Sequence, residues 1–145
     1  AILFETCGGS LDEIKGLVLN QEADAYCRSA AMCALSYAAA EGLVSRNDVL
    51  SFLGPLFTGK EASRSSAFWD LLAPTIYDLH PKGMMDVIKS AYERDLISPR
   101  MIRLREFEEQ MDRSVEEVLD DLRAEFKRDT PDNFHKRMAW WACFN

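Results

Sequence analysis

Histidines, paired cysteines and glycine-rich motifs are scarce in this sequence, and their scarcity excludes several classes of enzyme. The 145 residues include two histidines and four cysteines, with no CxxC spacing and no cysteine and histidine spaced as zinc ligands. Serine nucleophile elbows, phosphate-binding loops, dinucleotide fingerprints and the HExxH metal motif are all missing from the sequence. We therefore expect no catalytic residues, no cofactor and no metal site.

The sequence also lacks a long apolar run and a positive charge balance. No stretch approaches the roughly 20 consecutive apolar residues that a membrane-spanning helix needs. Seventeen basic against 24 acidic residues give a net charge of -7, which repels the phosphate backbone of nucleic acids. The one basic cluster, Arg100, Arg103 and Arg105, is followed by glutamates that neutralise it. We expect neither a membrane span nor nucleic-acid binding.

The cysteines indicate the cellular compartment of the protein, and the N-terminal residues indicate how much of the domain the sequence contains. The cysteines show no disulfide framework, and we expect small buried side chains in a reducing cytoplasm. The start of the chain has no basic residue and no signal-peptide core, and it also lacks a methionine. We expect a single domain over residues 1–145 that is truncated at its N-terminus. The apolar edge of Ile2, Leu3 and Phe4 would then be open to pairing as a homodimer.

The most informative segment is a helix built mainly from small residues. It begins at Asp24, a helix-capping residue, and ends at Gly42, which suits the left-handed conformation after a helix. Its polar side chains form one narrow stripe: Arg28, Ser29 and Ser36. Small residues let neighbouring backbones approach closely, as in the inner helix of a stacked helical repeat. We expect three of its residues to be nearly fully buried: Ala31, Ala34 and Leu35.

Start and stop signals predict seven or eight helices in all and no strand. Capping boxes begin two of them, at Ser10 and at Ser114. Helices are expected over 11–19, 24–42, 103–111, 115–126 and 131–142, and others start at Ser45, Phe68 and Pro81. The pair Gly54-Pro55 ends or kinks the helix that starts at Ser45, and Pro74 bends the helix that starts at Phe68. Residues 58–66 form a polar loop.

The helix over 115–126 presents a run of carboxylates on the side away from its apolar stripe: Glu116, Glu117, Asp120, Asp121 and Glu125. Carboxylates four residues apart on a helix can chelate a cation or pair as acid and base. The run contains no histidine and no Glu-x-x-His motif, which a metal site in a helical bundle would need. We expect a solvated acidic face.

Two resemblances concern the fold. Residues 20–41, with Asp24, Arg28 and Ala30-Ala31 before Ala34-Leu35, are similar to the inner-helix signature of a HEAT repeat. Over most of its length the chain resembles an uncharacterised bacterial family, domain of unknown function 1186. The second resemblance rests on these segments: Gly8-Gly9 before 11–19, 28–35 with 40–42, 78–81, and 140–144. The pair Gly54-Pro55 departs from the unbroken helix expected there. The family implies a helical repeat fold and no assigned activity.

Two groups of residues near the C-terminus could carry function. Cys143, His135 and Asp132 supply the parts of a thiol nucleophile, its base and an orienting acid, but the aromatic residues beside Cys143 disfavour a reactive thiolate. The second group is aromatic: Phe134, Trp140, Trp141 and Phe144. Adjacent tryptophans on a helix point about 100° apart, so one packing surface does not bury both. These aromatic residues either cap the helical stack or bind a partner.

The sequence thus predicts an all-α protein, a short solenoid of HEAT-like or armadillo-like helix pairs that binds or scaffolds other proteins in a bacterial cytoplasm. The alternative is an enzyme or small-molecule binder with a pocket between the helical layers, near Trp69, Tyr77 and Tyr92. A deep cleft with converging polar groups and a carboxylate or histidine of shifted pKa would favour the alternative.

Overall fold

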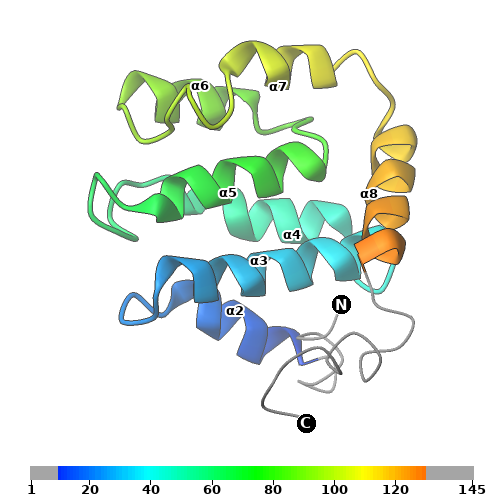
Figure 1. The fold of residues 1–145 in the computed structure, drawn as a ribbon, viewed down its shortest axis with the longest axis horizontal. Coiled ribbons are helices and arrows are strands. Elements are labelled where there is room, and N and C mark those ends of the chain that lie inside the picture. The colour runs from blue at the N-terminus through cyan, green and yellow to red at the C-terminus, as the bar shows by residue number, and fades with distance from the viewer. Residues whose placement is uncertain (1–9, 130–145) are drawn as a thin grey trace, which may run out of the picture.

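The computed structural model describes residues 10–129, and this part of the chain folds into seven α-helices and one short 3₁₀ helix, with no strand (Figure 1). The elements are α2 (Leu11–Leu19), α3 (Ala25–Ala40), α4 (Arg46–Leu53), η1 (Gly54–Leu56), α5 (Ala67–Asp78), α6 (Met85–Glu93), α7 (Leu104–Gln110) and α8 (Val115–Asp129). The all-α prediction is confirmed. The helix that we expected over 131–142 lies outside the described residues.

The helices follow one another in layers. Figure 1 shows α2, α3, α5 and the α6–α7 pair stacked in chain order, while α8 stands across the ends of this stack. The central helix α3 packs against α2, α4, α5 and α8, and α8 also contacts α5. Layers formed by helices adjacent in the chain are compatible with the solenoid that the sequence predicts.

The ends of α3 form as the sequence predicts. The carboxylate of Asp24 accepts a hydrogen bond from the amide of Tyr26, 2.8 Å away, at the start of the helix. At the other end Gly42 adopts a φ of +72°, and the amide of Leu43 donates to the carbonyl of Ala38, as in a Schellman turn. Local capping chemistry therefore sets both ends of this helix.

The two predicted capping boxes have different outcomes. Ser114 and Glu117 form the reciprocal pair: each accepts a hydrogen bond from the amide of the other, at 3.2 Å and 2.9 Å. Ser10 precedes α2 as predicted, but its hydroxyl makes no capping hydrogen bond. The start of α2 is held instead by the amide of Ile14, which donates to the carbonyl of Ser10.

The boundary at His80-Pro81 is confirmed, but the next helix does not begin at Pro81. His80 has a φ of 64° and Gly83 a φ of 89°, both in the left-handed region. Two left-handed residues so close together interrupt a right-handed helix, and α6 starts only at Met85. Further upstream, Gly54-Pro55 ends α4 by tightening it into η1, as the sequence predicts.

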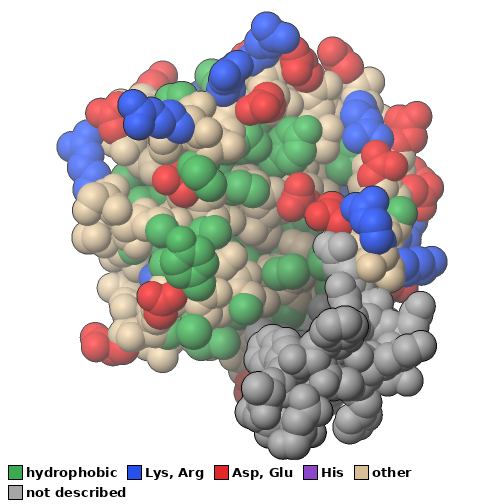
Figure 2. All heavy atoms as spheres, in the orientation of Figure 1, with side chains coloured by type: hydrophobic (Ala, Val, Ile, Leu, Met, Phe, Trp, Pro, Cys, Tyr) green, Lys and Arg blue, Asp and Glu red, His purple; other side chains and the backbone are tan. Residues whose placement is uncertain are grey.

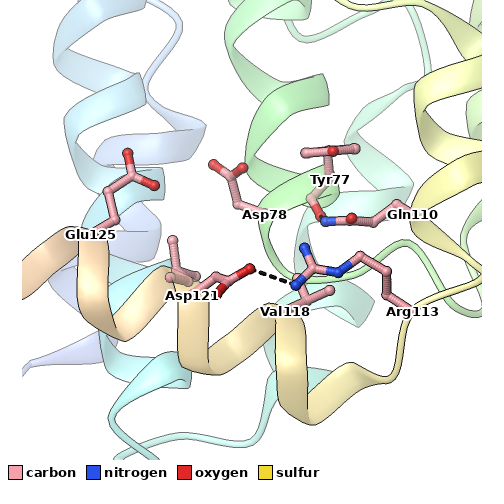
Figure 3. Close-up of a pocket in the computed structure, with 8 residues that line it drawn as sticks. Tyr77, Asp78, Gln110, Arg113, Val118, Asp121 and Glu125 are labelled. Carbon is pink, nitrogen blue, oxygen red and sulfur yellow. Dashed lines mark hydrogen bonds and ion pairs between the residues drawn. The ribbon is translucent and has the colours of Figure 1, made fainter.

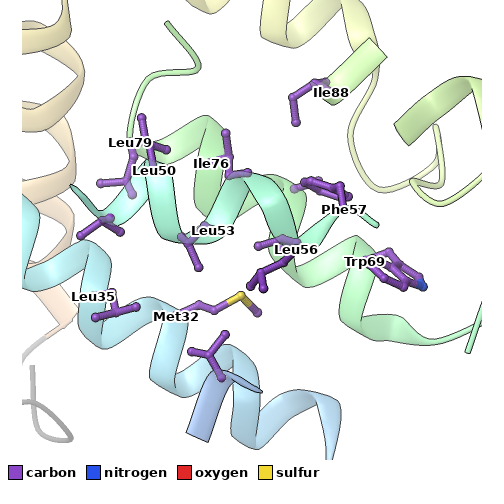
Figure 4. Packing of buried hydrophobic residues seen from close by; sticks show 14 of the residues in the cluster. Met32, Leu35, Leu50, Leu53, Leu56, Phe57, Trp69, Ile76, Leu79 and Ile88 are labelled. Carbon is purple, nitrogen blue, oxygen red and sulfur yellow. The ribbon is translucent and has the colours of Figure 1, made fainter. Parts of the chain in front are cut away.

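The hydrophobic core lies where α3, α4, α5 and α6 meet (Figure 4). Figure 4 shows side chains from these helices pointing toward one another: Met32, Leu35, Leu50, Leu53, Ile76 and Ile88. Ala31, Ala34 and Leu35 are 0%, 1% and 0% exposed, which confirms the burial predicted for them. The small residues of α3 thus bring its neighbours close.

The polar stripe predicted for α3 is wrong at two of its three positions, because Arg28 and Ser36 are buried. The guanidinium of Arg28 lies 3.7 Å from the centre of the Phe68 ring. Its Nε donates to the carbonyl of Val18 at 2.7 Å, and its Nη1 donates to the carbonyl of Glu61 at 2.9 Å. Arg28 therefore joins the end of α2 to the loop before α5.

Three further arginines bind carbonyl groups at the ends of other helices. Arg46 donates from Nε to the carbonyl of Leu79 at 2.5 Å, where α5 ends. Arg123 of α8 donates from Nε to the carbonyl of Ala40 at 2.5 Å, where α3 ends. Arg94 donates to the carbonyl of Phe57, directly after η1. The last carbonyls of a helix have no partner within it, and these arginines supply one.

We predict that Ala34→Leu lowers the free energy of unfolding by roughly 1–3 kcal/mol, because extra methylenes overpack a filled core. Ala30→Leu is the matched control, since Ala30 lies on the same helix with its side chain exposed. Urea denaturation of both variants measures the difference. Equal stability of A34L and the parent protein would show that the contact is not tightly packed.

We also predict that Arg28→Lys destabilises the fold by about 2 kcal/mol, because a single ammonium cannot reproduce two directed hydrogen bonds and the stacking on Phe68. Arg64→Lys is its control, since the ion pair of Arg64 with Asp95 is exposed. Thermal unfolding monitored by circular dichroism compares the two variants. A loss no larger in R28K than in R64K would contradict this assignment.

Candidate functional site

The outward side of α3 carries no charged side chain. Arg28 is the only charged residue of this helix, and it is buried. The exposed positions follow a helical stripe, which we call the α3 face: Tyr26, Cys27, Ala30, Cys33 and the half-buried Tyr37. Tyr26 alone keeps 69% of its surface exposed. Figure 2 shows hydrophobic side chains spread over α3 and α5 on the side of the molecule that it displays.

The α3 face corrects one prediction. We expected the cysteines to be buried, but Cys27 and Cys33 are free thiols at the surface. Cys7 and Cys143 lie outside the described residues. An exposed helix face made of alanine, cysteine and tyrosine is unusual on a protein whose residues are 28% charged. Exposed apolar surface of this kind is typical of a binding site.

A small polar pocket lies where α5, α7 and α8 meet, with a volume of about 140 Å³ (Figure 3). We call it the Tyr77 pocket, and its walls are Tyr77, Asp78, Gln110, Arg113, Val118, Asp121, Leu122 and Glu125. Arg113 donates from Nη2 to Asp121 at 2.5 Å, so these two charges compensate each other. The backbone of Arg113 is in turn held by His80, whose Nε2 lies 3.0 Å from the Arg113 carbonyl.

Two carboxylates of the Tyr77 pocket have no such compensation. Asp78 on α5 and Glu125 on α8 face each other across the gap between the two helices (Figure 3). Neither carboxylate has a hydrogen-bond or ion-pair partner within residues 10–129. Burial raises the pKa of Asp78 from 3.8 to about 6, and the nearby charge of Glu125 adds to the rise. The pocket is therefore a site of unbalanced negative charge.

The Tyr77 pocket adjoins the α3 face. Although Cys33 is at the surface, the surrounding helices partly desolvate its thiol and raise its pKa, and the carboxylates of Asp78 and Glu125 raise it further. The ring of Tyr37, at the end of the α3 face, meets the ring of Phe126 of α8 edge-on with centroids 5.5 Å apart. The apolar stripe thus ends beside the acidic pair.

The pocket predicted near Trp69, Tyr77 and Tyr92 does not form from these three residues. Trp69 is wholly buried, and its Nε1 donates to the carbonyl of Ser63 at 2.9 Å. The hydroxyl of Tyr92 donates to the carbonyl of Ile102 at 2.6 Å, so this hydroxyl stabilises the fold and does not line a pocket with Trp69 and Tyr77. Trp69 belongs to the core because the loop before α5 folds over it. Of the three residues, Tyr77 alone lines the Tyr77 pocket.

Other predicted site residues lie outside the described part of the chain. These are the candidate partner-binding residues Phe134, Trp140, Trp141 and Phe144, the trio Cys143, His135 and Asp132, and the N-terminal edge of Ile2, Leu3 and Phe4. Their roles stay predictions. For the residues that are described, no group of three or more histidine, cysteine or acidic side chains could hold a metal ion. No helix among them is long and apolar enough to cross a membrane.

The sequence did not reveal the acidic pair. In the sequence, Glu125 belongs to the carboxylate run of α8, and Asp78 belongs to the segment before the His80-Pro81 boundary. No local spacing links the two residues, because α6, α7 and their loops separate α5 from α8 in the sequence. The one available signal was the carboxylate of Asp78 in the last turn of its helix, where the negative end of the helix dipole disfavours an acidic side chain.

Comparison with known proteins gives a family match. A family model described as "Protein of unknown function (DUF1186)" matches residues 1–145. No curated protein and no solved structure matches the chain significantly.

We predict that Asp78→Asn stabilises the protein at neutral pH. The native state holds the Asp78 proton more tightly than the unfolded chain, so stability falls as the pH rises from about 4 to about 6. Asparagine removes this loss, and we expect a gain of about 1–2 kcal/mol near pH 7, discounted for partial exposure, with none near pH 4. Urea denaturation across this pH range measures it.

The exposed Asp112→Asn variant is the control, and it should keep the pH profile of the parent protein. If the free energy of unfolding of D78N changed with pH in parallel with that of the parent protein, burial would not penalise the Asp78 charge.

Proposed function

Because this chain belongs to the DUF1186 family, a family of unknown function, we propose its role from its own surfaces: a HEAT-like helical-repeat module for protein–protein interaction or scaffolding. The layered helices leave one long helix, α3, with an uncharged outward side. This exposed α3 face is the observation that supports the proposal. A repeat protein presents such helix faces side by side as an extended binding surface.

The chemistry of the α3 face suits a protein partner. Tyrosine supplies a large, rigid contact area with a hydroxyl group that can still be hydrogen-bonded. Alanine and cysteine leave room for the partner's side chains to approach the helix backbone closely. A surface free of charge also avoids the desolvation cost that a lysine or glutamate would add on binding.

Other parts of this proposal concern residues outside the described part of the chain. We include the aromatic residues Phe134, Trp140, Trp141 and Phe144 as further candidates for partner contact, because large aromatic side chains dominate interface energies. The apolar N-terminal residues Ile2 to Phe4 are candidates for a homodimer contact. The reduced cysteines Cys27 and Cys33 support a cytoplasmic setting.

A second candidate function rests on the raised pKa of Asp78. Asp78, whose pKa is about 6, and the neighbouring carboxylate of Glu125 can act together as an acid–base pair. Such a pair favours the function of an enzyme or a small-molecule binder at the Tyr77 pocket. The pocket volume of about 140 Å³ argues against it, because ligand pockets usually span about 300–1,000 Å³. The pocket fits one side chain better than a substrate.

We predict that Ala30→Glu reduces capture of the protein's partner at least tenfold, roughly the loss expected when a charge is buried in an apolar contact. The tagged protein is incubated with lysate of its native organism, and captured proteins are quantified by mass spectrometry. Ser51→Glu is the matched control, since it adds the same charge to an exposed position of α4.

The proposal requires proteins that bind the parent and S51E equally and are lost with A30E. Equal capture by all three, with each variant folded by circular dichroism, would place the interaction elsewhere.

A further inference from the structure

The Tyr77 pocket has fewer basic than acidic side chains around it, and two of its carboxylates lack a basic partner within residues 10–129. On α8, Glu116 and Asp120 pair with Arg123, and Asp121 pairs with Arg113. Asp78 and Glu125 remain without a cation among the described residues. Two unpaired carboxylates on facing helices repel each other, and a cation from outside residues 10–129 would relieve this repulsion.

The unpaired carboxylates of Asp78 and Glu125 lie at one end of the α3 face. Cys33 is close enough to feel the charge of both carboxylates, whereas Tyr26 begins the stripe two turns earlier. From Tyr26 to Tyr37 the stripe is about 17 Å long at 1.5 Å per residue. An apolar stripe of three turns that ends in uncompensated negative charge complements a segment with an apolar side and a cation at one end.

We propose that the α3 face and the acidic pair Asp78 and Glu125 together bind an amphipathic helical segment of a partner protein. The segment carries small or aliphatic side chains along about three turns and a lysine or arginine at one end. The apolar side chains lie on the α3 face, and the basic side chain enters the Tyr77 pocket between the two carboxylates. This inference rests on the proposed interaction function and names the chemistry of the partner.

The geometry favours a side chain over other cations. No group of three or more acidic, histidine or cysteine side chains in the described region could hold a metal ion. Two carboxylates alone supply few of the oxygen ligands that a divalent cation takes from a protein site. The pocket is lined by apolar Val118 and Leu122 besides its polar groups. These side chains can contact the methylene groups of lysine or arginine while the carboxylates bind the charged end.

A displayed library of random 16-residue peptides tests the proposal on the whole chain. The library is selected in parallel on the parent protein, on the D78N/E125Q double variant and on A30E. We expect peptides selected on the parent to combine an apolar helical stripe with a terminal lysine or arginine. Peptides selected on D78N/E125Q should keep the stripe and lose the basic residue, and A30E should select neither.

Anisotropy measurements on one selected peptide then quantify the coupling. Lysine-to-glutamine substitution in the peptide should weaken binding to the parent protein at least tenfold and binding to D78N/E125Q less than twofold. Binding of the lysine peptide should strengthen from pH 5 to pH 7 as Asp78 ionises, and binding of the glutamine peptide should not.

Two results would overturn parts of the assignment separately. Parent-selected peptides without basic enrichment, or an equal effect of the lysine substitution on both proteins, would remove the acidic pair from the site and leave the α3 face intact. Peptides that bind the parent and A30E equally would overturn the interaction function of the α3 face itself.

Discussion

Arginine guanidinium groups that bind carbonyl oxygens at helix ends hold this stack of helices together. Arg28 closes α2, Arg46 closes α5 and Arg123 closes α3, each from a different helix than the one it closes. A helix end leaves several carbonyls without partners, and the partial negative charge there attracts a cation. One arginine therefore satisfies the backbone and fixes two elements relative to each other, which apolar packing alone does less specifically.

The same interaction explains why α3 can present an uncharged surface. Its one charged residue, Arg28, turns inward to bind the carbonyls of Val18 and Glu61. The small residues on the other buried sides allow α2, α4, α5 and α8 to pack around it. What remains outside is tyrosine, cysteine and alanine. The α3 face and the central position of the helix thus have one origin in the sequence.

Local signals predicted much of the fold. Asp24 and Gly42 set the ends of α3, and Ser114 with Glu117 started α8, because capping depends on residues a few positions apart. The sequence could not predict that Arg28 is buried, since its partners come from α2 and a distant loop. It also missed the start of α6, where Gly83 adopts a left-handed conformation. The acidic pair escaped prediction because only the packing of α8 on α5 brings Asp78 to Glu125.

The position of α8 across the ends of the stack has a consequence for the order of folding. The hydrogen bond from Arg123 to the carbonyl of Ala40 joins residues 83 apart in the sequence, whereas α2 and α3 meet within one short turn. Contacts between neighbouring helices close small loops and form early, and contacts that close large loops form late. During synthesis the layers from α2 to α7 can assemble as they emerge, and the arrival of α8 completes the Tyr77 pocket. A nascent or C-terminally shortened chain would display the α3 face before it has any acidic pair.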